Sequence, residues 1–280
     1  MKNQLISVII PAYNSEKTIS VAINSILNQT YKNIEVIVVD DKSTDNTAQV
    51  VKNIIGNDKR VRLVESDNDP FRFDKNLNRN INAGYSARNT GFKYAKGKLI
   101  TFQDADDASL LNRIEIQYNL LCKYNATHLT LDWFKFDEKY LGKTFDDRKY
   151  LGNARVLKPE ELYKMSERSK GFVAKISPKI NSLIPFHLKR KRIINKLFFG
   201  SLEDYPGAGN SPLFKREIIE KVKFRKLQER IWPSFMGRGA DKDFNFQVAE
   251  TFKNSYVVIV PLYMWRVRNE NERYKDWVSF

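Results

Sequence analysis

Cysteine and histidine are scarce in this sequence. Its 280 residues include one cysteine, Cys122, and two histidines, His128 and His187. A single thiol excludes a disulfide framework within the chain and a cysteine-based zinc site. Two histidines argue against a histidine-rich metal centre and against most Ser-His-Asp mechanisms. The low cysteine content also fits a reducing compartment.

Long hydrophobic runs are absent as well. No stretch approaches the ~20 consecutive apolar residues that a membrane helix needs. The first apolar run, residues 5–10, is too short for the hydrophobic region of a secretion signal. Hydrophobic residues still make up 42% of the chain, which is enough to bury a full core. We therefore expect a soluble cytoplasmic protein, either free or bound at the cytoplasmic face of a membrane.

Acidic residues are missing from one segment. The formal net charge is +15, yet residues 1–110 are nearly neutral, with 15 Lys and Arg against 13 Asp and Glu. The basic charge therefore lies in residues 111–280, and residues 168–202 contain nine Lys and Arg and no acid. This pattern indicates two functional regions, and the lack of a linker predicts that they pack as one continuous globular unit.

Part of the acid-free segment has the composition of a membrane-surface helix. Residues 186–198 combine a Lys-Arg-Lys-Arg run with Phe, Ile and Leu. A basic amphipathic helix of this kind can lie on an anionic membrane. The alternative is a helix that packs on the domain and turns its basic face to solvent.

Strand and helix signals alternate through the first part of the chain. A continuous β-branched run typical of a buried parallel strand occurs at residues 6–10, and further strands are expected at residues 34–39, 61–64 and 98–103. Helical spacing follows the first three, in a helix capped by Asn14 or Ser15 and in helices over residues 45–56 and 85–96. This order predicts an α/β fold with a Rossmann-like, mostly parallel sheet flanked by helices.

The second part of the chain gives weaker signals. A helix is expected after Leu110, and residues 155–200 look mostly helical, which predicts a mainly helical basic C-terminal extension. Residues 211–216 and 256–267 look like strands. The polar residues 66–82 are expected to form a loop, and loops of this length are often functional.

Polar clusters follow three of the predicted strands. They are Pro11-Ala12-Tyr13-Asn14, Asp40-Asp41 and Asp104-Ala105-Asp106-Asp107. Ligands of an open parallel sheet bind beyond the carboxyl ends of its strands. Burial of a core requires no acid there, and five converging carboxylates repel each other unless a cation or hydrogen-bond donors compensate. We therefore expect a ligand site at this edge.

The types of side chain suggest which ligands bind. Mg²⁺ and Mn²⁺ prefer oxygen ligands and often bind one or two carboxylates together with substrate phosphates. Of Asp104 and Asp106, one can face such a metal while the other faces a sugar hydroxyl. Tyr13 can stack on a base, and Asp40 or Asp41 can accept from a base N–H or a ribose hydroxyl. The alternatives are an acidic turn that caps the next helix, a packing aromatic and a solvated turn.

Five stretches together carry a family resemblance. They are residues 8–14, 25–31, 38–45, 87–91 with 95–97, and 104–107. In this order they resemble glycosyltransferase family 2, whose members have the GT-A fold. One position departs from the family pattern, because the usual Gly after the first acidic pair is Lys42.

The resemblance implies a role for each cluster. The residues expected to bind the nucleotide-sugar donor are Pro11, Ala12, Tyr13, Asn14, Asp40, Asp41, Arg88 and Asp104. Asp106 is expected to bind Mn²⁺ or Mg²⁺, with Asp104 as a second candidate ligand. A surface Arg on a helix is the alternative reading of Arg88.

The family's catalytic base lies in a Glu-Asp pair that opens a helix. The matching site here is Gly239-Ala240-Asp241-Lys242-Asp243, in which Ala240 replaces the Glu. The resemblance therefore assigns the base to Asp241, with Asp243 and the Glu203-Asp204 pair as alternatives. A carboxylate that simply caps the helix is the structural alternative.

The expected reaction is that of an inverting glycosyltransferase. By the resemblance, residues 1–110 bind a nucleotide-sugar donor, with UDP favoured, and residues 111–280 bind the acceptor. The acceptor is expected to be a glycan or a lipid-linked saccharide of a cell-surface polymer. Four residues that can line its pocket are Trp232, Phe235, Trp265 and Arg266; core packing explains the aromatic residues equally well.

Three other functions compete with this one. The net charge of +15 suits a nucleic-acid-binding or catalytically degenerate nucleotide-binding α/β protein, but the acids lie at the ligand edge and no nucleic-acid motif occurs, so no nucleic acid is expected. A sugar-phosphate nucleotidyltransferase would carry a Gly-rich loop after the first strand, and residues 11–14 contain no Gly. A processive synthase would carry membrane spans.

Overall fold

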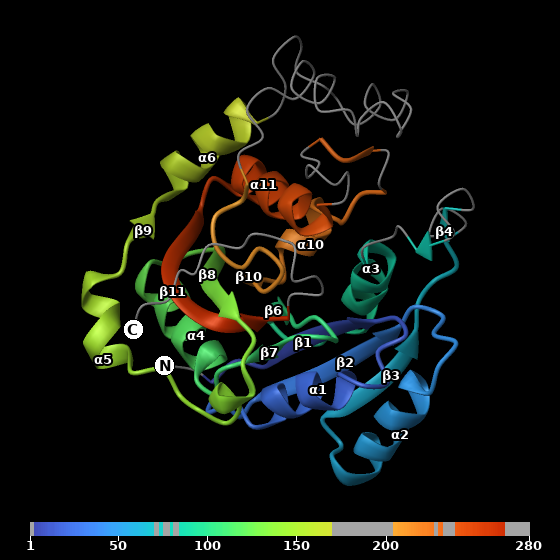
Figure 1. The fold of residues 1–280 in the computed structure, drawn as a ribbon. Coiled ribbons are helices and arrows are strands. Elements are labelled where there is room, and N and C mark those ends of the chain that lie inside the picture. Colours follow the sequence, from blue (N-terminus) through green and yellow to red (C-terminus); the bar gives the residue numbers. More distant parts are fainter. Residues whose placement is uncertain are drawn as a thin grey trace.

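Strands rich in β-branched residues form the centre of the molecule. The computed structural model describes residues 3–69, 73–74, 79–80, 84–169, 204–226, 229–231 and 239–266. Within these residues the main sheet has nine strands (Figure 1). They are β1 (Ile6–Ala12), β2 (Ile34–Asp40), β3 (Val61–Glu65), β6 (Leu99–Phe102), β7 (Ala108–Ser109), β8 (His128–Lys135), β9 (Val156–Leu157), β10 (Leu213–Lys215) and β11 (Ser255–Trp265).

The topology places the carboxyl ends of most strands at one edge of the sheet. The strand order is β3-β2-β1-β6-β10-β8-β11-β7, and β9 pairs with β11 beside this path. β1, β2, β3 and β6 are parallel, as the alternation of strands and helices predicts. β10 runs antiparallel to both β6 and β8, so β8 and its parallel neighbour β11 point the same way as β6. The carboxyl ends of β1, β2, β6, β8 and β11 therefore share one edge.

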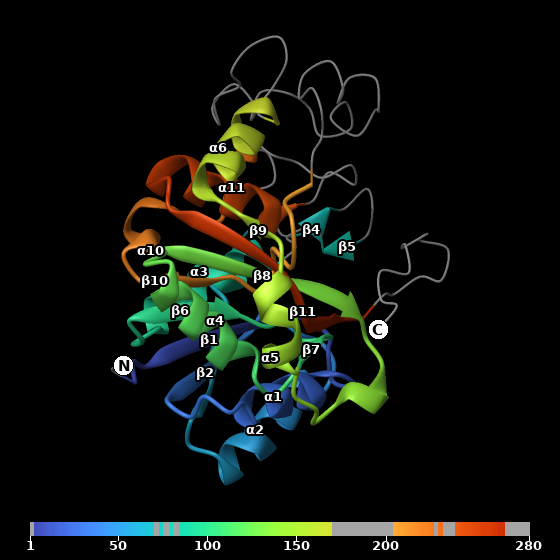
Figure 2. The same cartoon turned by 90° about the vertical axis from the view of Figure 1, so that its left-hand side faces the viewer.

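Helices cover both faces of the sheet. The main helices are α1 (Ile19–Leu27), α2 (Thr47–Asn57), α3 (Tyr85–Tyr94), α4 (Arg113–Lys123), α6 (Pro159–Arg168) and α11 (Ala240–Phe252), with short helices α5 (Asp147–Tyr150) and α10 (Ile218–Lys221). One core lies under α1, α2 and α4, and a second lies under α3, α10 and α11. α6 packs beside α11 (Figure 2).

The sequence of β1 shows why the strand occupies the centre. Val8 and Ile10 pack in the core under α1, whereas Ile9 packs in the core under α3. Successive side chains of a strand point to opposite faces, so a strand covered on both faces is apolar throughout. Gly91 of α3 crosses close above it, because a Cβ there would lie 2.5 Å from the side chain of Ile9.

The predicted α/β fold is confirmed, with corrections in detail. α1 begins at Ile19, and its N-cap is Thr18 and not Asn14 or Ser15. The Ser15 hydroxyl donates to the Tyr13 carbonyl and therefore does not cap the helix. The expected loop at residues 66–82 contains a short antiparallel pair, β4 (Phe73–Asp74) with β5 (Arg79–Asn80). β8 was not predicted at all.

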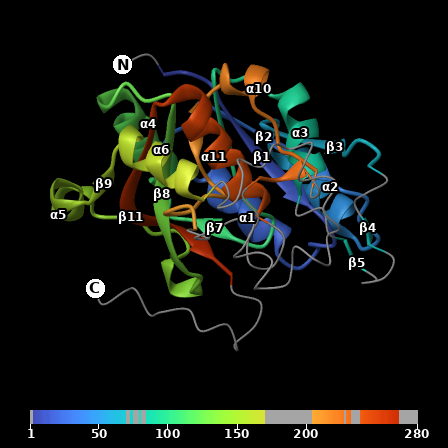
Figure 3. The same ribbon diagram turned by 90° about the horizontal axis from the view of Figure 1, so that it is seen from above.

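The predicted basic extension and its amphipathic helix lie mostly outside the residues that the structure describes. Of the acid-free segment 168–202, only residues 168 and 169 are described, so the basic amphipathic helix at 186–198 lies outside the described residues. The main sheet takes β8, β10 and β11 from the second half, and β8 and β11 run side by side (Figure 3). In the part of the chain that the structure describes, no helix combines the length and apolar character needed to cross a bilayer.

Candidate active site

Asp104 lies at the centre of the shared strand edge. It follows β6, and its side chain is about a quarter exposed. The Arg88 guanidinium donates from Nη2 to Oδ1 at 2.5 Å, and the Asn210 amide donates to Oδ2 at 2.8 Å. The arginine comes from α3 and the asparagine from the segment before β10, so three distant parts of the chain meet at one carboxylate.

The position of Arg88 depends on its surroundings in α3. The side chain is buried, and its guanidinium carbon lies 5.6 Å from the ring centre of Phe102 and 5.4 Å from that of Phe224. Gly84, which precedes the helix, has φ of 69°, and a Cβ there would come within 2.7 Å of Arg88 Nη1. Glycine at position 84 therefore leaves room for the arginine to reach Asp104 and adopts this left-handed backbone without strain.

Asp107 ties the acidic turn to the end of β11. It is buried; Tyr263 donates its hydroxyl to Oδ2 at 2.7 Å, and the Arg266 N–H donates to Oδ1 at 2.7 Å. The same Tyr263 hydroxyl accepts the N–H of Asp104 at 3.1 Å, and Arg266 Nε donates to the Asp106 carbonyl at 2.9 Å. Burial raises the pKa of Asp107 well above its usual range, and the nearby charges of Asp104 and Asp106 raise it further.

The carboxylates are close enough to repel each other. Burial raises the pKa of Asp104; the charges of Asp106 and Asp241 raise it further, while Arg88 and Asn210 oppose the rise. This local excess of negative charge and oxygen donors fits a hard divalent cation. Among the described residues, no three His, Cys, Asp or Glu side chains form a metal cage by themselves. Ions of this kind are often held by one or two carboxylates together with the phosphates of a ligand.

Asp241 faces this cluster from the first turn of α11. It is half-buried, and its Oδ2 would lie 3.5 Å from a Cβ on Gly209, the residue before Asn210. The charge of Asp241 also raises the pKa of Asp104. Asn245, one turn further along the helix, donates both to the Asp241 carbonyl at 2.8 Å and to the Gly209 carbonyl at 2.6 Å. The same asparagine therefore fixes Asp241 and the segment that delivers Asn210 to Asp104.

The other acids proposed as alternatives to Asp241 have different surroundings. Asp243 is fully buried, and it accepts the Ile231 N–H and the Gln247 amide, each at 2.8 Å, with Arg225 at 3.5 Å. Asp204 is 87% exposed and lies 3.6 Å from Lys242. Glu203 lies outside the described residues. Among the candidate bases that the structure describes, Asp243 is fully buried and Asp204 is almost fully exposed, whereas Asp241 is half-buried beside the segment that carries Asn210.

The first two polar clusters adjoin each other at the ends of β1 and β2. The Asp41 N–H donates to the Ala12 carbonyl at 2.7 Å, and the Thr44 N–H donates to Asn14 Oδ1 at 2.8 Å. Asp40 is half-buried and accepts the Ser43 N–H at 3.2 Å. The turn thus uses the side chains of Asn14 and Asp40 to satisfy its own backbone.

The other residues of these two clusters differ in burial and in their contacts. Tyr13 is half-buried, whereas Asp41 is buried. Pro11 lies against Gly84, since a Cβ on that glycine would be 3.3 Å from the Pro11 Cβ, which links this turn to the helix of Arg88. Lys42 has φ of 63°, a left-handed conformation that glycine adopts without strain. The position thus has the backbone shape expected for the family's Gly.

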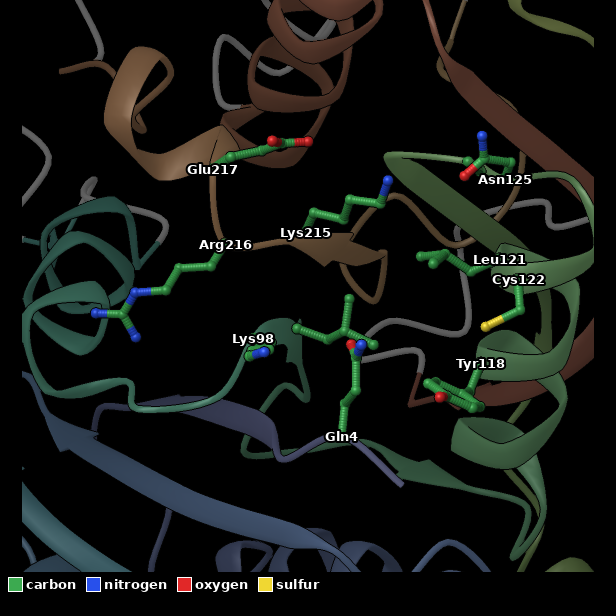
Figure 4. Close-up of a pocket in the computed structure, with 11 residues that line it drawn as sticks. Gln4, Lys98, Tyr118, Leu121, Cys122, Asn125, Lys215, Arg216 and Glu217 are labelled. Atoms are coloured by element: carbon green, nitrogen blue, oxygen red, sulfur yellow. The ribbon is translucent and has the colours of Figure 1, made fainter. Parts of the chain in front are cut away.

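A cavity of about 380 Å³ lies away from all these residues (Figure 4). It is bordered by Tyr118 and Cys122 of α4 and by Leu99 at the start of β6, together with Lys98 and Lys215. Because Leu99 begins the strand that Asp104 follows, the cavity lies towards the opposite edge of the sheet. None of the predicted site residues lines it.

We expect His128 to make the stability of the fold depend on pH. It is fully buried in β8, its Nε2 lies 2.8 Å from Asn245 Oδ1, and burial lowers its pKa from 6.5 to about 4. The unfolded chain therefore takes up this proton at a higher pH than the folded chain does. The stabilisation is complete above pH 6.5 and is lost as the pH falls towards 4.

We expect His128→Gln to weaken that dependence, because the amide can donate to Asn245 but does not titrate. Urea unfolding of both proteins at pH 7.5 and pH 5 measures it. The wild type should lose more stability over this interval than the variant does. Equal losses in the two proteins would show that His128 is not buried in its neutral form.

Comparison with known proteins identifies the family. A family model described as glycosyl transferase family 2 matches residues 7–182. The Escherichia coli protein UDP-Glc:alpha-D-GlcNAc-diphosphoundecaprenol beta-1,3-glucosyltransferase WfgD is 38% identical over 129 residues, which are 46% of this chain and 46% of WfgD. The matches span less than half the length of the first curated relatives.

Solved structures with the same fold cover nearly the whole chain. Residues 1–349 of Staphylococcus aureus TarS in complex with UDP give a TM-score of 0.55 at 19% identity, over 94% of this chain and 60% of that one. The Pyrobaculum calidifontis mannosyltransferase PcManGT, in complex with GDP-Man and Mn²⁺, gives 0.55 at 18% identity, over 97% of this chain and 59% of that one. These similarities show the GT-A fold, and together with the family match they establish that this chain belongs to glycosyl transferase family 2.

Proposed function

We propose that this chain is an inverting, divalent-metal-dependent glycosyltransferase that moves a sugar from a UDP-sugar to a hydroxyl of a lipid-linked saccharide. One observation carries the proposal. Asp104 is held between Arg88 and Asn210, with Asp106 beside it and Asp241 across from it, at the edge where β1, β2 and β6 end. This edge is where open α/β sheets bind nucleotides.

The donor would lie along this edge. The base and ribose would contact the turns at Pro11–Asn14 and at Asp40 and Asp41, and Asp104 would accept from a hydroxyl of the ribose or of the donor sugar. Arg88 would hold Asp104 in place and add positive charge near the nucleotide. Asp106, with Asp104 as the second candidate, would hold Mn²⁺ or Mg²⁺. When bound, that ion offsets the negative charge that develops on the leaving diphosphate.

Asp241 would act as the general base. Its carboxylate takes the proton of the acceptor hydroxyl as the hydroxyl oxygen forms a bond to the anomeric carbon. The bond from that carbon to the diphosphate oxygen breaks in the same displacement, and UDP leaves with the bonding electron pair. A single displacement inverts the configuration at the anomeric carbon.

The donor and acceptor classes come from relatives. The name of WfgD states UDP-Glc as donor and a GlcNAc-diphosphate lipid as acceptor, and WfaP of Escherichia coli, 33% identical over 142 residues, has the same specificity in its name. A lipid-linked acceptor would bring the chain to a membrane surface, where the basic residues 186–198 are proposed to contact anionic lipids. Equal sedimentation of the wild type with neutral and anionic vesicles would refute that contact.

A turnover assay tests the proposed function. The protein is incubated with Mn²⁺, a GlcNAc-diphosphate that carries a short alkyl chain, and UDP-glucose, UDP-galactose or UDP-GlcNAc in turn. We expect one donor to release UDP in an acceptor-dependent manner and to give a β-linked product from its α-linked sugar. An α-linked product would contradict inversion, and failure of every UDP-sugar to bind would contradict the donor assignment.

A further inference from the structure

A second group of residues suited to sugars lies beside the carboxylate cluster. Asp132 and Trp133 lie near the end of β8, and Trp265 ends β11. All three are half-buried. The two indole rings meet with their centres 4.9 Å apart at 86°, so that the edge of one ring lies against the face of the other.

An irregularity in the sheet brings these residues to the face of the active site. Leu131 and Phe134 pack in the same core although they are three positions apart, which breaks the alternation of a regular strand between them. The pairing of β8 with β11 shifts register on both sides of Pro261, which is opposite Asp132. Shifts of this kind re-aim side chains next to active sites.

The pairing with β11 fixes which face Trp133 and Trp265 occupy. Leu262 and Met264 pack in the core under α4, so Tyr263 and Trp265 lie on the opposite face. Trp133 is the register partner of Tyr263 and contacts Trp265. Both indoles therefore share the face on which the Tyr263 hydroxyl binds Asp107 and the Asp104 N–H.

Hydrogen bonds connect the group to the site on two sides. Arg266, the residue after Trp265, donates to Asp107 and to the Asp106 carbonyl. The Ala208 N–H donates to the carbonyl of Leu131 at 2.8 Å, two residues before Asn210 reaches Asp104. Gly207 passes so close that a Cβ there would collide with the same carbonyl. The group therefore adjoins the acidic turn and the segment fixed by α11.

The chemistry of the three side chains matches a pyranose. The C–H groups of a pyranose make one flat face apolar, and such a face packs on an indole, while the hydroxyls at its rim seek acceptors. Asp132 Oδ1 accepts the backbone N–H of Trp133 at 2.9 Å. Among the described residues, no donor to the other oxygen, Oδ2, is found. That oxygen can accept from a sugar hydroxyl, which a carboxylate does more strongly than a neutral group.

We propose that Asp132, Trp133 and Trp265 form the acceptor subsite, in which a pyranose of the acceptor packs on the indoles and hydrogen bonds to Asp132. This inference rests on the proposed function and adds the residues that would select a saccharide acceptor. The opposing interpretation is that the two indoles only close the end of the sheet, in which case the acceptor would not contact them.

Binding measurements on the full chain distinguish these interpretations. The probes are UDP with Mn²⁺, and the short-chain GlcNAc-diphosphate added to the UDP-loaded protein, both by titration calorimetry. Asp132→Asn keeps the side-chain volume, Trp265→Phe keeps a smaller aromatic ring, and Trp265→Ala removes the ring. The control is Tyr124→Ala, which removes one ring of another half-exposed aromatic pair. In that pair the ring centres of Tyr124 and Tyr256 lie 5.0 Å apart, at the amino end of β11.

We expect Asp132→Asn and Trp265→Ala each to raise the Kd of the GlcNAc-diphosphate by about tenfold, the effect of losing one good contact. Trp265→Phe should raise it less, because a smaller ring still offers a face. The Kd of UDP should stay within about twofold in every variant, and Tyr124→Ala should leave both constants unchanged.

Three results would overturn the inference. The first is an unchanged Kd of the GlcNAc-diphosphate in folded Asp132→Asn and Trp265→Ala. The second is the lack of any binding of that probe to the wild type. The third is an equal rise in the Kd of UDP, which would place the indoles at the donor. Failure of the proposed function is seen separately, as absence of UDP binding or of transfer in the wild type.

Discussion

Asp241→Asn is expected to lower kcat by about 10²- to 10⁴-fold, the usual contribution of a general base. Asparagine keeps the shape of the side chain but cannot take the acceptor proton. The backbone contacts of Asp241 with Asn245 do not involve the side chain and should persist. The Kd of UDP and the Tm should therefore change little. Initial rates of UDP release measure kcat, calorimetry measures the Kd of UDP, and thermal unfolding measures the Tm.

Asp243→Asn is the matched control two residues further along α11. Asp243 is fully buried and accepts from Ile231 and Gln247, and its removal should lower stability instead. Loss of a buried charged acceptor typically costs on the order of 1–3 kcal/mol, more where a partner such as Arg225 is left uncompensated. If Asp243→Asn lost turnover at unchanged stability while Asp241→Asn stayed active, the base would be Asp243.

Asp106→Asn should lower kcat/KM by about a hundredfold or more, since metal coordination contributes several kcal/mol to stabilising developing charge. The variant should also need more Mn²⁺ for half-maximal rate than the wild type. Removal of the ion with EDTA should abolish wild-type turnover, and added Mn²⁺ should restore it. A titration of initial rate against Mn²⁺ for both proteins gives these values.

The control for Asp106 is Asp137→Asn, which removes an acid that pairs with Lys139 near the end of β8. It should leave the Mn²⁺ requirement unchanged. Full wild-type activity in EDTA would rule out the metal. An unchanged Mn²⁺ curve in Asp106→Asn would instead move the ion to Asp104, the second candidate ligand.

The first half of the fold follows from local sequence because its strands are buried on both faces. β1, β2 and β6 consist largely of apolar residues, many of them β-branched or aromatic, and polar residues occur at or just after the end of each strand. β8 has no such run, since it contains His128, Thr130 and Asp132. Its polar residues are accommodated by partners far away in the chain, as His128 is by Asn245. Local periodicity carries no trace of such partners.

Contacts between distant parts of the chain in the candidate site also leave no signal in the local sequence. The acids of the strand ends are visible in the sequence because a core does not require them there. Tyr263 reaches Asp107 across 156 positions, and Asn210 reaches Asp104 across 106. Neither contact has a local signal. The one hint for Asn210 is its place directly after a Gly-Ala-Gly segment, whose tight approach to Leu131 only the three-dimensional structure explains.

Lys42 shows how the structure clarifies a departure from the family pattern. Lysine replaces the usual Gly, yet the backbone keeps a positive φ of 63°. The side chain forms an ion pair with Glu65 at the end of β3. The turn after Asp40 and Asp41 therefore keeps a shape that favours Gly. A left-handed conformation costs a residue with a side chain roughly 1–2 kcal/mol relative to glycine.

A crystal structure with UDP and Mn²⁺ tests the donor site most directly. We predict that Mn²⁺ contacts Asp106 and the diphosphate, that the uridine lies between Tyr13 and the Asp40-Asp41 turn, and that Asp241 stays within reach of the space beyond the diphosphate. A nucleotide bound elsewhere, for example in the cavity beside Tyr118 and Leu99, or a metal bound without Asp104 or Asp106, would contradict the proposed site.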